Sequence, residues 1–252
     1  MKNKPMMAFL MCGFLLMNAA NVAATAFPAV SGKKIIEKMH RKWAGKWYRN
    51  LQFEQTVDFY KENKMVKQEV WQELLNAPGN LHLRFNGFET GNGAIFRNDS
   101  VYYFTNGVMT RKEERIHQLL LLGFDVYFQA PEVTIQKLTK TGIDLSRGYD
   151  TIVDHRPVRV LGTNDPKDRQ SNQCWIDQEN WYLLKVGSFK NGHLSEIDFG
   201  AYKTIQGYPV ATEITFKTDG QLMMVEKYFN ISFPITVPSV LYDPLQFQQS
   251  RW

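Results

Sequence analysis

Cysteine is almost absent from this chain. Two cysteines occur among 252 residues, and Cys12 lies in an N-terminal segment that we predict is removed, which leaves Cys174. One cysteine cannot form an internal disulfide, and no cysteine pair is present for a tetrahedral metal site. The five histidines stand singly, without the four-residue spacing of a helical zinc site. The sequence therefore excludes a disulfide scaffold and predicts no metal and no other cofactor.

Catalytic signatures are missing as well. The sequence contains no Gly-x-Ser-x-Gly motif and no phosphate-binding loop with its lysine. Carboxylates do occur close together, as in Glu113 with Glu114 and Asp165 with Asp168, but no spacing marks either pair as an acid and base. We therefore predict a protein that is not an enzyme and has no catalytic residues.

The charge balance excludes one class of partner. The chain has 30 basic and 25 acidic residues, spread along its length. Nucleic-acid binding needs lysine and arginine gathered on one face, so we predict no nucleic-acid partner.

The N-terminus is typical of a secretory signal peptide. Lys2 and Lys4 precede an apolar run over residues 6–17, and Ala24 and Ala26 place small residues where a signal peptidase cleaves. Asn18 ends the apolar run before it reaches the length of a membrane span. We predict cleavage after residue 26, with residues 27–252 forming one domain of a periplasmic protein exported across the inner membrane.

Hydrophobic periodicity predicts a mainly β fold with helices. Apolar residues recur at helical spacing over residues 32–48, and the period changes to two from Leu51 onward. Residues 115–128 are too continuously apolar for a one-faced strand and predict a buried helix, preceded by a charged turn over residues 111–115. Turn residues separate the alternating runs, which predicts an antiparallel meander with one covered face. Periodicity leaves open whether that face encloses a filled core or a cavity for an apolar ligand.

Three passages of the chain form a recognisable series. The first is the N-terminal helix followed by Phe53-Glu54-Gln55 and the turn from Pro78. The second is Trp175-Ile176-Asp177 with Leu183-Leu184-Lys185. The third begins at Ile197-Asp198-Phe199, passes through Gly207-Tyr208-Pro209 and ends near Leu241-Tyr242. Together these passages span nearly all of the predicted mature chain and resemble the LolA-like family of periplasmic lipoprotein-sorting and lipid-carrier proteins.

The resemblance implies a single curved antiparallel sheet, forming an incomplete, half-open β-barrel closed by a helical lid. Its apolar cavity would bind the acyl chains of a lipid or lipoprotein and shuttle them toward the outer membrane. An inner-membrane donor or exporter and an outer-membrane acceptor would then be partners of a monomeric carrier. The residues that alternation and the helices place in this cavity are Trp43, Trp47, Phe53, Val57, Leu83, Phe85, Leu120, Phe124, Ile197, Phe199, Ile214 and Phe216.

One position departs from the resemblance. The arginine that precedes the turn proline in well-known members, and helps hold the lid closed, is matched here by Ala77. Two other functions stay open beside the carrier: an envelope stress-sensing or interaction module of the same fold, and an envelope lipid hydrolase.

Overall fold

The computed structural model describes residues 31–252, so the predicted signal peptide over residues 1–26 lies outside the described residues. Three α-helices and thirteen strands are formed within the described range. The helices are α1 (Gly32–Trp43), α2 (Gln118–Gly123) and α3 (Pro131–Lys140), and a 3₁₀ turn, η2 (Asp125–Tyr127), follows α2. The strands are β1 (Asn50–Lys61), β2 (Lys64–Asn76), β3 (Asn80–Phe85), β4 (Gly93–Arg97), β5 (Ser100–Thr105), β6 (Val108–Glu114), β7 (Gly148–Val153), β8 (Arg156–Leu161), β9 (Gln173–Asp177), β10 (Leu183–Lys190), β11 (His193–Ile205), β12 (Tyr208–Thr218) and β13 (Gln221–Ser232).

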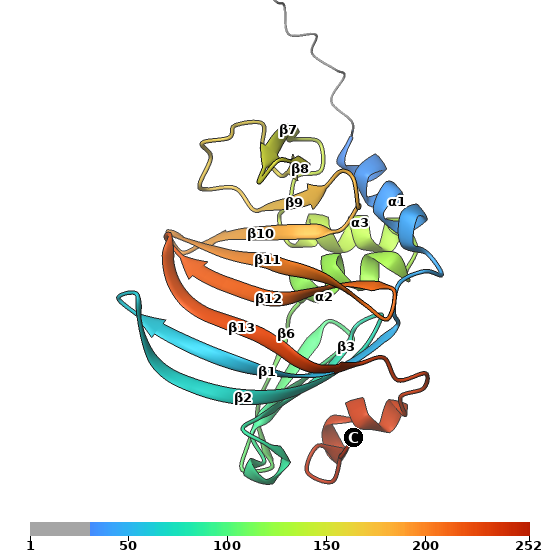
Figure 1. Cartoon of the computed structure of the whole chain (residues 1–252), viewed down its shortest axis with the longest axis vertical. Helices are drawn as coiled ribbons and strands as arrows, with labels where there is room; N and C mark the ends of the chain where they lie inside the picture. The colour runs from blue at the N-terminus through green and yellow to red at the C-terminus, as the bar shows by residue number, and fades with distance from the viewer. Residues whose placement is uncertain (1–30) are drawn as a thin grey trace, which may run out of the picture.

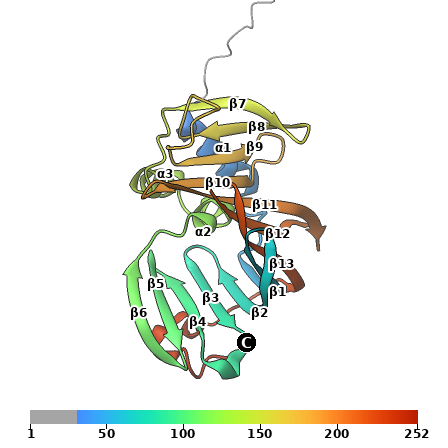
Figure 2. The same cartoon turned by 90° about the vertical axis from the view of Figure 1, so that its left-hand side faces the viewer.

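All these strands form one antiparallel sheet in the order β6-β5-β4-β3-β2-β1-β13-β12-β11-β10-β9-β8-β7. Two meanders, β1 to β6 and β7 to β13, are joined where β1 pairs with β13. The sheet is strongly curved, and its end strands β6 and β7 lie at opposite ends of the molecule, so it does not close into a barrel (Figures 1 and 2). The predicted single curved sheet is confirmed.

The hairpin turns follow the predicted chemistry. Asn106, Asn191 and Asp219 all have positive φ and are each followed by a glycine with positive φ, between β5 and β6, β10 and β11, and β12 and β13. Short polar residues and glycine adopt this conformation at low cost. The charged turn predicted over residues 111–115 is wrong, because most of this segment belongs to β6. An end strand with mostly exposed side chains needs no apolar alternation, so its sequence looks like a loop.

The helices differ from the prediction in length and number. The helix predicted over residues 32–48 ends at Trp43, because Gly45 turns the chain with a φ of 72°. The helix predicted over residues 115–128 divides into α2 and η2 at Phe124, whose φ of −139° is not helical. Helix α3 was not predicted, and it begins with Pro131 in its first turn, where a proline costs no hydrogen bond.

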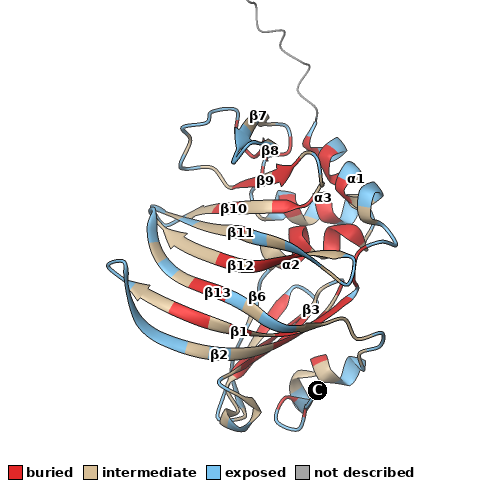
Figure 3. Cartoon of the chain, viewed as in Figure 1, coloured by how far each residue is buried: buried red, intermediate tan, exposed pale blue. Residues whose placement is uncertain are grey.

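Helices α1, α2 and α3 with η2 form a helical layer that packs on the concave face of the sheet (Figures 1 and 2). Buried side chains gather on the helical layer and on the strands beside it (Figure 3). The main apolar core lies between the two, with Ile36 and Met39 of α1, Leu121 of α2 and Leu138 of α3 all fully buried or nearly so.

The C-terminal tail, residues 233–252, covers part of the opposite, convex face. Its Tyr242 and Phe247 form a second apolar cluster with Leu74, Ile95 and Phe104 from β2, β4 and β5. Leu74 is buried beneath the tail while its neighbour Leu75 is buried in the main core. The predicted alternation of one covered and one solvated face therefore fails on this part of the sheet, because both faces are covered.

Candidate functional site

The residues that the sequence predicted for a cavity lie on the concave face of the sheet, except Trp43, Trp47, Leu120 and Phe124, which lie on or beside helices α1 and α2. Trp47, Phe53, Val57, Leu83, Leu120, Phe199 and Ile214 are buried, and Trp43, Phe85, Phe124, Ile197 and Phe216 are half-buried. All except Val57 belong to the main core or pack against it. Val57 is fully buried, but Glu69 and Glu226 pair with it across the neighbouring strands. The strand residues thus share one face, as alternation predicted.

A small pocket lies between the helical layer and the sheet. It holds about 260 Å³ of empty space, part of it open to solvent. Three of the predicted residues, Trp47, Phe124 and Phe199, line it together with Tyr48, Leu51, Gly123, Tyr202, Val210, Ala211 and Tyr228. The pocket walls are therefore apolar and aromatic, as expected of a site for an apolar ligand.

Three of the pocket residues that sequence reasoning missed are tyrosines. Tyr202 lies just beyond Ala201, whose φ of 47° interrupts the two-residue period of β11. Its hydroxyl donates to the carbonyl of Leu183 at 2.6 Å, so the phenol is satisfied while its ring stacks on Tyr182 at 4.0 Å. Tyr48 follows the end of α1 and contacts the Phe124 ring edge-on. No pattern in the sequence indicates that Tyr48 or Tyr202 lies at the pocket.

Helix α2 lies close to the sheet at the pocket. A Cβ on Gly123 would stand 3.4 Å from the ring of Phe199 on β11. A larger side chain there would force α2 away from this ring, since interiors are close-packed. The closeness of α2 to Phe199 limits the size of the pocket.

Asp125 ties the helical layer to the β2–β3 turn. Its Oδ1 accepts a hydrogen bond from the backbone N–H of Gly79 at 2.8 Å. Burial raises the pKa of this carboxyl to about 6, while the Gly79 bond and Lys137 oppose the shift. The position matched by Ala77 therefore supplies no side-chain anchor, and the turn is held two residues later by an aspartate of η2.

Other polar contacts hold the same layer. The Arg49 guanidinium lies over the Phe128 ring at 4.7 Å and donates to the carbonyl of Ala77 at 2.9 Å. A ring nitrogen of His40 lies 3.0 Å from the carbonyl oxygen of Val126. Trp43 Nε1 donates to the carbonyl of Asn180 at 2.8 Å. These bonds fasten the helical layer at its edges, whereas apolar contacts hold its centre.

A polar cluster lies on the concave face beside the pocket. It consists of Gln55 on β1, Glu73 on β2 and Glu226 on β13, all less than 10 % exposed. Gln55 Nε2 donates to Glu73 Oε1 at 2.8 Å. Burial raises the pKa of Glu73 well above its usual range, helped by repulsion from Glu226, and raises that of Glu226 to about 8. Sequence reasoning missed this polar cluster, although Gln55 interrupts the apolar face of its strand.

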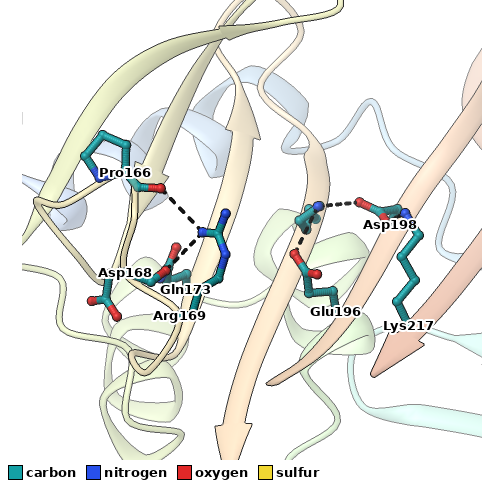
Figure 4. Close-up of polar contacts among 8 residues, drawn as sticks. Pro166, Asp168, Arg169, Gln173, Glu196, Asp198 and Lys217 are labelled. Carbon is teal, nitrogen blue, oxygen red and sulfur yellow. Dashed lines mark hydrogen bonds and ion pairs between the residues drawn. The ribbon is translucent and has the colours of Figure 1, made fainter. Parts of the chain in front are cut away.

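The convex face of β10 to β12 is charged. Lys185 on β10 forms ion pairs with Glu196 at 3.2 Å and Asp198 at 3.1 Å, and Lys217 reaches Asp198 at 3.3 Å (Figure 4). Partly exposed pairs like these contribute little to stability, and they keep this face in contact with water. Charged side chains thus occupy the convex face at the centre of these three strands.

Reactive groups are placed unfavourably for catalysis. Burial raises the pKa of the Cys174 thiol to about 12, so the thiolate is scarce at neutral pH. Burial lowers the pKa of His82 and of His117 to about 3 each. Asp168, one of the carboxylates considered from sequence, accepts backbone bonds from Gln170 and Ser171 in an exposed loop, and that loop is drawn in Figure 4. Within residues 31–252, no group of three or more His, Cys, Asp or Glu is arranged to hold a metal ion.

Three solved structures share this architecture. A DUF1329 family protein from Desulfovibrio piger superposes with a TM-score of 0.58 at 11% identity over 84% of this chain and 95% of its own. A LolA superfamily protein from Nitrosomonas europaea superposes with a TM-score of 0.54 at 15% identity, over 85% of this chain and 98% of its own. A domain from Vibrio parahaemolyticus named for outer membrane lipoprotein sorting superposes with a TM-score of 0.59 at 13% identity, over 86% of this chain and 98% of its own.

No protein-family model and no curated protein matches the sequence itself. The chain therefore has a LolA-like fold, established by three-dimensional likeness at low sequence identity. In the described part of the chain, none of the helices has the length and hydropathy needed to span a membrane.

Proposed function

We propose that the protein is a periplasmic carrier that binds the acyl chains of a lipid or lipoprotein between the concave face and the helical layer. The observation that carries this proposal is the largely apolar and aromatic lining of that face, together with a pocket bounded by Phe124 and Phe199. The fold shared with a LolA superfamily protein and with a domain named for outer membrane lipoprotein sorting supports it. The export signal predicted over residues 1–26 supplies the proposed location.

The energetics of such binding need no catalytic group. Each methylene transferred from water is worth about 0.8 kcal/mol, so a ten-carbon chain supplies roughly 8 kcal/mol before ordering costs. Release then requires an acceptor with comparable apolar surface, which the proposal assigns to an outer-membrane partner, with a donor at the inner membrane.

The helical layer has to move for a chain to enter. Ligand sites usually enclose about 300–1,000 Å³, whereas the enclosed part of this pocket holds about 10 Å³, which is room for about one water molecule. Displacing α2 from Phe199 would join the pocket to the half-buried concave residues Ile197 and Phe216. The closed arrangement is therefore proposed as the unloaded form.

Extraction of bound lipid is the direct experiment. The mature protein is purified from the cell envelope and analysed by native mass spectrometry, followed by organic extraction and identification of the bound molecules. A stoichiometric lipid or acylated peptide is the expected result. A protein that emerges empty and takes up no fluorescent acyl probe would contradict the carrier function.

A pair of variants locates the ligand. Phe216→Asp places a charge on the concave face of β12, and Thr215→Asp places the same charge on the opposite face of the same strand. We expect Phe216→Asp to lose at least about tenfold in affinity for the acyl probe and Thr215→Asp to bind as the parent does. Circular dichroism establishes that both are folded. Equal binding by a folded Phe216→Asp variant would remove Phe216 from the site.

A further inference from the structure

The polar cluster of Gln55, Glu73 and Glu226 has a geometry that an apolar core does not need. Gln55 pairs with Trp71 and Tyr228 on its two sides, while Glu73 pairs with Phe53 and Glu226 with Val57. The two glutamates therefore flank Gln55 along a diagonal of three adjacent strands, β2, β1 and β13. All three side chains belong to the concave face.

The polar cluster contains a buried acceptor without a hydrogen-bond partner. Gln55 is fully buried, and its Oε1 has no hydrogen-bond partner. Its Nε2 donates to Glu73. A hydrogen bond from the same side chain lowers the pKa of Glu226, against the larger effect of burial. Among residues 31–252, no lysine, arginine or histidine forms an ion pair with either glutamate. Buried acceptors are normally matched by donors. Within the cluster, the donors are the Gln55 amide and the protons that the carboxyls hold, and the N–H groups of a bound cation could take the place of those protons.

The charge of the polar cluster points the same way. Burial favours the neutral form of both carboxyls, which raises the pKa of each. Two further titratable groups are near: Tyr228 on β13, whose phenol pKa is raised by burial and then by these two carboxyls, and Glu69 on β2, which Lys67 and Trp71 hydrogen-bond. Lys67 is thus already bound to Glu69. Because no cation is paired with Glu73 or Glu226, both carboxyls keep their protons.

The surroundings are aromatic and continue into the pocket. The ring of Tyr228 stacks on Phe53 at 4.1 Å, and Tyr228 also lines the pocket. On the other side, Trp71 packs against Phe85 at 4.4 Å. Aromatic faces attract cations as well as apolar chains. A ligand with its chain in the pocket would therefore bring its polar end past Tyr228 to the carboxyls.

We propose that Gln55, Glu73 and Glu226 form a subsite for the primary ammonium group of a lipid whose chain occupies the pocket. The ammonium donates to Gln55 Oε1 and to the carboxyls, and one carboxyl proton leaves as the cation enters, so the net charge of the cluster does not change. This inference rests on the proposed function, because it requires that the concave face accept an apolar chain.

The test compares three ligands of equal chain length: decylammonium, decanol and decanoate. Isothermal titration calorimetry of the mature protein at pH 7, in two buffers of different ionisation enthalpy, gives both affinity and protons released. We expect decylammonium to bind at least about tenfold tighter than decanol, decanoate to bind weakest, and protons to be released with the ammonium alone.

Variants assign the preference to these residues. Glu73→Gln and Glu226→Gln keep the side-chain volume and the neutral state, so both are expected to fold. Each should lower the affinity for decylammonium toward that for decanol and leave decanol binding unchanged. Glu196→Gln, on the convex face of β11, is the matched control and should keep the parental preference.

The outcomes separate the two proposals. Equal binding of decylammonium and decanol by the parent protein, or an unchanged preference in both folded glutamine variants, would overturn the ammonium subsite and leave the carrier intact. Failure of all three ligands to bind would overturn both. The parent comparison decides the matter even where a variant does not fold.

Discussion

Asp125 ties the helical layer to the β2–β3 turn, and its replacement by asparagine tests the electrostatics of that tie. The carboxyl is 3 % exposed and accepts its bond from Gly79 N–H at 2.8 Å. Asparagine keeps the size and the accepting oxygen, so the hydrogen bond is retained while the charge is removed. Any difference between the two proteins should then follow the ionisation of Asp125.

The size of the effect follows from the pKa. Burial raises the pKa of Asp125 from 3.8 to about 6, so the folded protein binds its proton more tightly than the unfolded chain. The stabilisation from this proton is fully present below about pH 4 and is lost as the pH rises through about 6. At 1.36 kcal/mol per unit, the shift corresponds to about 3 kcal/mol. Asp125→Asn should therefore be more stable than the parent above pH 6 by up to about 3 kcal/mol.

Urea unfolding at intervals from pH 4 to pH 8 measures this difference. The free energy of unfolding of the variant minus that of the parent should rise between pH 4 and pH 8. Taking this difference removes the contributions of the other buried groups, which are the same in both proteins. Asp154→Asn, in an exposed turn, is the control and should follow the parent at every pH. A constant difference between Asp125→Asn and the parent would refute the assignment of a raised pKa to Asp125.

Two further perturbations test the packing. Phe247→Ala should lower the free energy of unfolding by about 3–5 kcal/mol. The reason is that the Phe247 ring stacks on Phe104 at 3.8 Å and contacts the Arg84 guanidinium, which lies over its face. A loss below about 1 kcal/mol in urea unfolding would show that the tail is not tightly packed. Cys174, fully buried with its thiol pKa raised to about 12, should resist iodoacetamide until the protein unfolds, and rapid alkylation of the native protein would contradict this.

Alternation along the strands predicted the concave face well, because a period of two separates the faces wherever one is covered. Phe199 and Ile214 are paired across β11 and β12 as that rule requires. The rule failed where the backbone leaves the regular period. Ala201 in β11 has positive φ, and Tyr202 beyond it reaches the pocket from a position that counting by twos does not give.

The alternation of apolar and polar residues did not predict the polar residues on the concave face. Gln55 occupies an inward position between Phe53 and Val57, but an amide among apolar residues carries no sign of its partners. The approach of Glu73 and Glu226 depends on the pairing of β1 with both β2 and β13, which is a long-range property. The same limit applies to Phe247, whose partners lie on strands far away in sequence.

The pairing of β1 with β13 also has a consequence for how the molecule assembles. The other strand pairs join strands that are neighbours in sequence. This pair joins the first strand of the chain, β1, to the last strand, β13. Such distant pairings are slow to form because the chain must close a long loop first. The concave face is therefore completed late, after β13 has been synthesised, and until then the apolar strands of both meanders need protection from aggregation.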